Sequence, residues 1–547
     1  MSSASRTTTA AGARAAEEIR QQIMWNRLLA IVEEQGQALV RTAFSSMVRE
    51  CGDLSAGVFD ERGRMLAQAV TGTPGHVNTM AESVRHFMER FPPDDATEGD
   101  SYLTNDPWLG TGHLNDFVVV APIFHRAARV GYVACTSHLL DVGGIGFGPD
   151  GTDVYMEGIS IPPIKLTDAG VVNAALISLV KANSRLPVES EGDIYSLLAC
   201  CETGSRRVIE MMEEFSIDSL GDLSSYILER SEKAVSNAIA ELPNGHFDNE
   251  MTIDGYDEPV TLKARVTVGD NNVTVDFSGS SAPSTRGINV PLTYTKAYAS
   301  FALACAISPG TPNNSGSLRP YQVTAPENTI VNAVRPHAVA VRHIIGQMLP
   351  DVVFGCLRKC VPDRVPAEGT SSLWNIILRS TPSSQHPFML MAATNGGTGA
   401  RPCKDGLSAT AFPSGVKGTP VEILESTNPV IVWRKDLRSG SGGAGKYRGG
   451  LGQHIELGNI HNEDMELLAA YDRIKHPARG VGGGQDGAPG FVGLASGAAL
   501  NSKGTQRIAG GTRLVIKTPG GAGIGEPSSR NSQLIAADVK SEFTEGH

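Results

Sequence analysis

Two segments of the chain repeat one spacing of potential metal ligands. His113 and Asp116 lie in the loop NDPWLGTGHLNDF, and His138 and Asp141 have the same His-x-x-Asp form in TSHLLDVGG. Imidazole nitrogens and carboxylate oxygens together suit Zn²⁺, Mn²⁺ or Fe²⁺, with positions left open for water or substrate. Asp53, which follows the N-terminal apolar segment, could add a further carboxylate. The alternative is that all of these are polar turn residues at the ends of strands.

The apolar runs beside these segments indicate how they could meet. VVVAPIF (118–124) and VGYVACTSHLL (130–140) are typical of strands, and a short polar connection separates them. If the two strands pair as a hairpin, the start of the first and the end of the second lie at the same edge of the sheet. The two His-x-x-Asp segments would then face each other, which favours a metal site over two unrelated turns.

Apolar periodicity and turn-forming residues predict the remaining elements. They are helices over 15–49, 78–91, 205–242 with a break near 216–218, 294–308 and 344–360, and β-hairpins over 56–69 and 260–279. Residues 1–14 have no apolar core segment, so they predict a disordered leader and not a secretory signal.

A chain of 547 residues is too long for one hydrophobic core, so we expect several domains. Helical patterns give way to short strands near residue 246, and glycine becomes frequent after residue 390. The predicted division is a leader (1–14), an α/β metal-site domain (15–245), a mixed β/α domain (246–390) and a glycine-rich β domain (391–547). The predicted fold class is therefore α+β, or mixed α/β, with a β-dominated C-terminal region.

Glycine is unusually abundant, with 61 residues, and it concentrates in TNGGTGARP, RSGSGGAGKYRGGLG, GVGGGQDGAPG and TPGGAGIGEP. We expect wide turns there, because glycine tolerates positive φ. GSGGAGKY (440–447) comes close to the phosphate-binding pattern G-x-x-x-x-G-K-[ST], but Tyr447 replaces the small hydroxyl that would reach Mg²⁺. Since no helix is predicted after it, the segment argues against ATP binding by this chain.

Composition excludes several other classes of protein. The formal net charge is −11 and basic residues are not clustered, so a nucleic-acid partner is not expected. No run of eighteen apolar residues would span a membrane. Eight cysteines without a C-x-x-C pair predict free thiols in a reducing, cytoplasmic protein.

The segments DLSAGVFDERGRMLAQA, TNDPWLGTGHLNDFVVVAPIF, SHLLDVGG, EGISIPPIKL, SLRPYQVTAPENTIVN, SGGAGKYRGGLG and TPGGAGIGEP, in this order, resemble the hydantoinase B family. That family includes B subunits of ATP-dependent hydantoinases, parts of 5-oxoprolinases, caprolactamase and α subunits of acetone-type carboxylases. The resemblance covers residues 20–530. It implies a divalent metal, Zn, Mn or Fe, held by Asp53, His113, Asp116 and His138. Many relatives read His-His-x-Asp where this chain has His138-Leu139-Leu140-Asp141, so a second imidazole is missing here.

The resemblance also implies an activity shared between two subunits. An A-type partner with an actin-like ATPase fold would bind ATP and Mg and phosphorylate the substrate, and this chain would act on the activated species as part of a hetero-oligomer. We expect a cyclic-amide hydrolase for hydantoin, lactam or oxoproline-like rings. His76 and Asp141 are the expected proton-transfer residues, with His76 preferred and Glu157 as a further candidate. The alternatives are an acetone- or acetophenone-type carboxylase subunit and a non-catalytic scaffold subunit.

Overall fold

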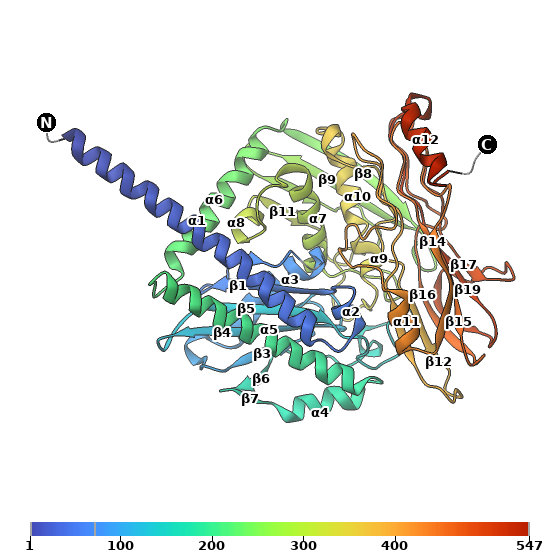
Figure 1. Ribbon diagram of the computed structural model, residues 1–547, viewed down its shortest axis with the longest axis horizontal. Helices are drawn as coiled ribbons and strands as arrows, with labels where there is room; N and C mark the ends of the chain where they lie inside the picture. The colour runs from blue at the N-terminus through green and yellow to red at the C-terminus, as the bar shows by residue number, and fades with distance from the viewer. Residues whose placement is uncertain (1–2, 71–72, 545–547) are drawn as a thin grey trace.

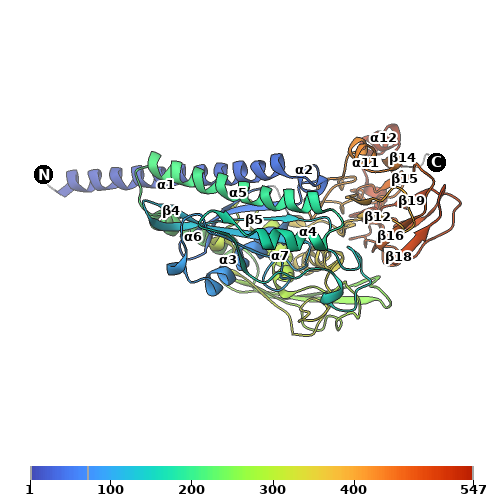
Figure 2. The same ribbon diagram turned by 90° about the horizontal axis from the view of Figure 1, so that it is seen from below.

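The computed structural model describes residues 3–70 and 73–544, and it has the mixed α/β architecture predicted from the sequence. Its N-terminal half is built on a seven-stranded sheet in the order β2-β1-β5-β4-β3-β6-β7. Helices α1 and α5 cover one face of this sheet and α3 packs on the other (Figures 1 and 2). The strands are β1 (Leu54–Asp60), β2 (Met65–Gln68), β3 (Ser101–Thr104), β4 (Asp116–His125), β5 (Ala128–His138), β6 (Ile164–Asp168) and β7 (Val171–Val172). The helices are α1 (Ser3–Thr42), α2 (Ser46–Arg49), α3 (Pro74–Arg90), α4 (Ala174–Asn183), α5 (Pro187–Glu214) and α6 (Gly221–Ala240).

Strands β4 and β5 form the predicted hairpin at the centre of this sheet. Asp116, the first residue of β4, pairs with His138, the last residue of β5, so the two ligand segments meet at one sheet edge. Val119 packs toward the α1 and α5 side, and its neighbour Val118 packs toward α3. Because both faces of the sheet are covered, the strands are apolar throughout instead of alternating.

Two helices begin earlier than the sequence suggested. Helix α3 starts at Pro74 and not at residue 78, because Thr73 caps it by accepting the N–H of His76 at 3.2 Å and proline occupies its first turn. His76 therefore lies inside the helix. Helix α1 begins at Ser3, where a disordered leader (1–14) was expected, and its start projects from the body of the molecule (Figure 1).

The middle of the chain forms a four-stranded sheet in the order β11-β10-β9-β8, with helices α7 and α10 packed on one face. Strand β9 alternates buried and more exposed residues, as expected for a sheet covered on one side. Its strands are β8 (Gly245–Ile253), β9 (Val260–Val268), β10 (Val273–Asp276) and β11 (Tyr321–Thr324), and its helices are α7 (Leu292–Ile307), α8 (Ser315–Leu318), α9 (His343–Gly346) and α10 (Leu349–Leu357). The helix predicted over 344–360 is thus divided in two.

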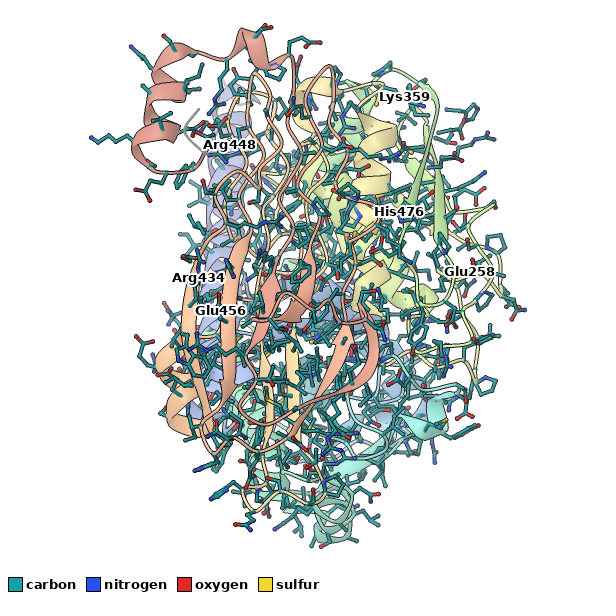
Figure 3. The ribbon with its side chains drawn as sticks, turned by 90° about the vertical axis from the view of Figure 1, so that its right-hand side faces the viewer. Glu258, Lys359, Arg434, Arg448, Glu456 and His476 are labelled. Carbon is teal, nitrogen blue, oxygen red and sulfur yellow. The ribbon has the colours of Figure 1, made fainter. Side chains whose placement is uncertain are left out.

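Two further four-stranded sheets, in the orders β13-β12-β16-β18 and β14-β15-β19-β17, share one core in the C-terminal region. Their strands are β12 (Ile376–Ser380), β13 (Met389–Ala392), β14 (Val430–Leu437), β15 (Gln453–Asn459), β16 (Met465–Ala470), β17 (Phe491–Leu494), β18 (Lys503–Ile508) and β19 (Leu514–Lys517), with helices α11 (Val421–Thr427) and α12 (Ser532–Lys540). Figure 3 shows Arg434 of β14 beside Glu456, its register partner on β15. The domain boundaries themselves stay a prediction.

The glycine-rich segments are not the wide turns that we expected. Three of them run side by side and hydrogen-bond through their backbones: Gly450 donates its N–H to Thr398 at 2.8 Å, and Gly521 donates to Gly450 at 2.9 Å. A Cβ added at Gly397 would come within 1.8 Å of the Gly450 carbonyl oxygen. Glycine is needed there because no side chain fits between the segments, and not because a turn demands positive φ.

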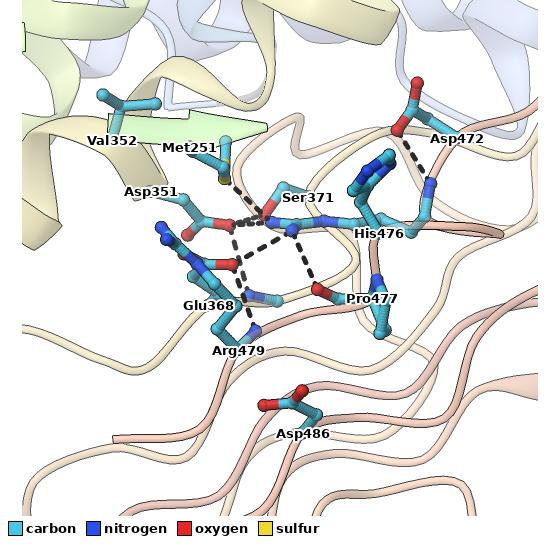
Figure 4. A network of polar contacts seen from close by, with 12 residues as sticks. Met251, Asp351, Val352, Glu368, Ser371, Asp472, His476, Pro477, Arg479 and Asp486 are labelled. Atoms are coloured by element: carbon cyan, nitrogen blue, oxygen red, sulfur yellow. Dashed lines mark hydrogen bonds and ion pairs between the residues drawn. The ribbon is translucent and has the colours of Figure 1, made fainter. Parts of the chain in front are cut away.

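A buried ionic network joins the middle and C-terminal parts (Figure 4). Arg473, which follows β16, donates to Asp351 of α10 and to Glu368, at 3.0 Å in both cases. Arg479 donates to the other oxygen of Glu368 at 2.7 Å. Arg473 is fully buried, so its charge depends on these two carboxylates.

Among the helices of the described residues, none is both long and apolar enough to cross a membrane.

Candidate metal centre

His113, Asp116 and His138 come together at the edge of the central hairpin. Nε2 of His113 lies 2.7 Å from Oδ1 of Asp116, and Nδ1 of His138 lies 3.0 Å from the same oxygen. All three side chains are buried, and one ligand atom from each lies within 4.8 Å of the others. Two imidazoles and a carboxylate converging on one point form the core of a zinc, manganese or iron site.

His76 links this cluster to Asp53. Its Nε2 lies 2.9 Å from Oδ2 of Asp116, and its Nδ1 lies 3.4 Å from Oδ1 of Asp53. The early start of α3 brings His76 into the pocket, and Asp53 lies just before β1, where its carbonyl accepts the N–H of His138. Asp53, His76, His113 and His138 thus line one pocket, and the fully buried Asp116 contacts the three histidines. Asp53 reaches the cluster through His76.

Asp141 lies outside this pocket. Its carboxylate is buried, but it pairs with Arg185 at 2.5 Å and accepts the N–H of Gly143 at 3.3 Å. The chain turns away from the sheet after β5, so the second His-x-x-Asp motif contributes only its histidine. Asp141 therefore holds the loop after β5 through Arg185 and Gly143, away from the cluster that it was expected to serve.

Two pocket residues were missed because they come from a distant segment. Arg342 donates to Oδ2 of Asp116 at 2.6 Å and to the Thr111 carbonyl at 2.7 Å, with its guanidinium 4.1 Å from the Tyr294 ring centroid. His343 lines the pocket and stacks on Phe147. The only local signal was a charged pair inside the apolar run AVAVRHIIG.

The charges of the cluster favour a neutral imidazole beside an ionised carboxylate. Burial, with the nearby Arg342 guanidinium, lowers the pKa of His113 to about 3. Burial alone would raise the pKa of Asp116, but His113, His76 and Arg342 hold that pKa well below its usual range. Burial alone would lower the pKa of His76, and the carboxylates of Asp116 and Asp53 raise it instead.

The cluster contains buried nitrogen and oxygen atoms that could bind a cation and have no hydrogen-bond partner. Four of them face this cluster: Oδ1 of Asp53, Nδ1 of His76, Nε2 of His113 and Nε2 of His138. Nδ1 of His113 lies 2.9 Å from the carbonyl oxygen of Ala340, which can only accept, so this nitrogen carries the proton and Nε2 keeps its lone pair. Unpaired buried lone pairs are costly unless something binds them, so the residues fit a metal ion.

Comparison with known proteins places the chain in a family. A model of the hydantoinase B/oxoprolinase family matches residues 17–527. The chain belongs to this family. A protein of Pseudomonas sp. (strain NS671) that is named as the B component of a D-/L-hydantoinase is 30% identical over 96% of this chain and 93% of its own length.

Two solved structures share the fold of this chain. The crystal structure of the ATP-dependent caprolactamase from Pseudomonas jessenii matches with a TM-score of 0.88 and 24% identity, covering 96% of this chain and 94% of that chain. An acetone carboxylase in its nucleotide-free structure matches with a TM-score of 0.81 and 18% identity, covering 96% and 78%.

In this hydantoinase B protein, the position after His138 belongs to the core. Leu139 is fully buried within the cluster under α1 and α5. An imidazole at this position would point away from the pocket and into that core. The pocket instead gains His343 from α9 and the carboxamide of Asn375, whose Oδ1 is buried without a hydrogen-bond partner.

Proposed function

We propose that this chain is the metal-containing B-type subunit of an ATP-dependent cyclic-amide hydrolase that acts on a hydantoin, lactam or oxoproline-like ring. The observation that carries the proposal is the buried His113–Asp116–His138 cluster with its unpartnered donor atoms, in a chain of the hydantoinase B family. In the proposed site Asp53 joins these three residues as the fourth ligand.

The side chains around the cluster suit such a reaction. A bound Zn²⁺, Mn²⁺ or Fe²⁺ would supply Lewis-acid chemistry, polarising a substrate oxygen and lowering the pKa of water. Arg342 keeps Asp116 ionised and oriented. His76, between two carboxylates, is the residue we propose for accepting a proton.

The carboxamide of Asn375 favours an amide substrate. A cyclic amide offers an N–H donor beside its carbonyl, and Asn375 lines the pocket with a carboxamide whose Oδ1 is a buried acceptor without a hydrogen-bond partner. A ketone substrate, as in the carboxylase alternative, has no N–H to satisfy this oxygen. The carboxamide of Asn375 therefore supports the hydrolase over the carboxylase, although the acetone carboxylase shares the fold.

ATP and Mg²⁺ would be bound by an A-type partner subunit in a hetero-oligomer. The packing of GSGGAGKY supports this division of labour, because Gly443 and Gly445 approach neighbouring backbone too closely to leave a phosphate-binding loop. The segment is also followed by an irregular stretch and then β15, and not by the helix that a phosphate loop requires.

The test is to co-express the chain with its A-type subunit and measure ATP hydrolysis with hydantoins or lactams, and separately with ketone plus bicarbonate. Metal content is measured on the same samples. We expect bound metal and cyclic-amide-dependent ATP hydrolysis, with both lost in His113→Ala and retained in His246→Ala, a surface histidine on β8.

Response to ketone plus bicarbonate alone would select the carboxylase alternative. An active complex without metal would overturn the ligand assignment. A complex in which His113→Ala changes neither metal content nor activity would favour a non-catalytic scaffold role for this chain.

A further inference from the structure

The segment 338–342 contacts two residues of the candidate metal centre, His113 and Asp116. The carbonyl of Ala340 accepts the Nδ1–H of His113 at 2.9 Å, and Arg342 binds Asp116 at 2.6 Å. Two of the expected ligands therefore take their orientation from this one short segment, which has no regular secondary structure before α9.

Glu157 fixes this segment in turn. Its Oε1 accepts the backbone N–H of Val339 at 2.8 Å and that of Ala340 at 2.7 Å. Glu157 thus binds the backbone N–H of Ala340, the residue whose carbonyl oxygen holds His113. A continuous path of hydrogen bonds runs from Glu157 through Ala340 to His113.

The surroundings of Glu157 leave its side chain little room to adopt another conformation. The side chain is 3% exposed, and a Cβ added at Gly287 would lie 3.0 Å from Oε1. The second carboxylate oxygen, Oε2, has no hydrogen-bond partner, so burying this side chain is costly. A residue that served packing alone would not need an acceptor here, which points to a role for the two N–H contacts.

We propose that Glu157 is a positioning residue of the metal centre: it orients the Ala340 carbonyl, which selects the tautomer and ring orientation of His113. The inference rests on the proposed metal site. Partners that orient a ligand histidine change metal affinity by about 10–100-fold when they are removed, and Glu157 acts one hydrogen bond further out.

The test compares Zn²⁺ affinity of the full chain, stripped of metal, by competition with a chelating dye. Glu157→Asp keeps the carboxyl group but shortens the side chain, so it cannot reach both N–H groups, and we expect affinity to fall about 10-fold or more. Glu157→Gln keeps the length and an acceptor oxygen, so we expect affinity within about threefold of wild type.

Asp193→Ala is the matched control. Asp193 is also buried, accepts two consecutive backbone N–H groups on one oxygen, from Phe44 and Ser45, and leaves its other oxygen unpartnered. We expect it to lower the thermal midpoint of the metal-free chain without lowering Zn²⁺ affinity, which separates positioning from general destabilisation.

If Glu157→Asp yields no folded protein, Gly287→Ala takes its place, because the added methyl would lie 3.0 Å from Oε1 and push it from its position between the two N–H groups by a few tenths of an ångström. Zn²⁺ affinity equal to wild type in the folded Asp or Ala variant would overturn the role of Glu157 and leave the metal site standing. Equal losses in Glu157→Asp and Glu157→Gln would also overturn it. Absence of Zn²⁺ binding by the wild type would overturn the metal site itself.

Discussion

At the scale of residues, Asp116 organises the candidate centre. It accepts a hydrogen bond from Thr111 at 2.7 Å and one from Arg342 at 2.6 Å, and three histidines lie within 3.0 Å of its oxygens. The strand register places it opposite His138, while the long side chain of Arg342 reaches it from a remote segment. One carboxylate therefore joins the hairpin, helix α3 and the segment before α9.

Asp116→Asn should abolish metal binding and destabilise the chain. The neutral amide binds a cation weakly and leaves the buried charge of Arg342 without its partner, a change that costs about 3–5 kcal/mol. Metal analysis and chemical denaturation would measure the two effects. Asp141→Asn is the control, because its partner Arg185 is 40% exposed; loss of metal in this variant would contradict our placement of Asp141.

Glu157 should make the stability of the metal-free chain depend on pH. Burial raises the pKa of its carboxyl to about 8, above the value near 4.3 expected in the unfolded chain. Between these values the folded state binds more protons, so the free energy of unfolding falls as pH rises from about 4.5 to 8, by on the order of 5 kcal/mol.

Glu157→Gln cannot titrate, so its thermal midpoint relative to wild type should rise across this pH window and level off above about pH 8. Thermal unfolding at a series of pH values, in the presence of a chelator, would measure the difference. A difference that does not change with pH would contradict a raised pKa at Glu157.

At the scale of elements, the glycine-rich segments act as packed layers. Their backbones lie so close that carbonyl oxygens occupy the space where side chains would stand, and their N–H groups bond to the neighbouring segment. This arrangement satisfies buried backbone groups without regular strands. It explains why glycine is abundant in a region whose two sheets are otherwise ordinary.

Gly450→Ala should be strongly destabilising for this reason. The added methyl carbon would lie 2.0 Å from the Leu407 carbonyl oxygen, so the backbone must move, and overpacking of this kind costs about 1–3 kcal/mol or more. Gly310→Ala is the control, since nothing lies within 4 Å of its added methyl. Denaturation midpoints that fall equally in both variants would contradict close packing as the cause.

At the scale of the whole molecule, the Arg473 network connects the part that carries α10 to the C-terminal sheets. Arg473, Asp351 and Glu368 are buried, whereas the side chain of Arg479 is 49% exposed. Removing the central cation leaves the buried carboxylate of Asp351 without an ion-pair partner and leaves Glu368 with Arg479 alone. The contact between α10 and the C-terminal region therefore depends on Arg473 more than on Arg479.

Arg473→Met should cost about 3–5 kcal/mol and expose the C-terminal region to limited proteolysis. Arg479→Met should have a much smaller effect, because water solvates that charge and surface pairs contribute about 0–1 kcal/mol. Chemical denaturation and digestion of both variants would compare them. Equal effects would show that the network does not depend on the buried cation.

The sequence by itself determined the part of the site that lies within one hairpin and the loop before it. The apolar runs on both sides of a short connection predicted the β4–β5 hairpin, and the hairpin alone brings His113, Asp116 and His138 to one edge. The mixed fold and the positions of most helices followed from equally local patterns. Ordered motifs over most of the chain indicated the family.

Only the tertiary structure decided which other groups complete the pocket. Arg342 and His343 lie more than two hundred residues from Asp116, and no local spacing relates them. The direction of Asp141 depends on how the chain leaves β5, and the role of the glycines depends on which segments pack together. Each outcome depends on contacts between segments distant in sequence, which periodicity and spacing within one segment do not encode.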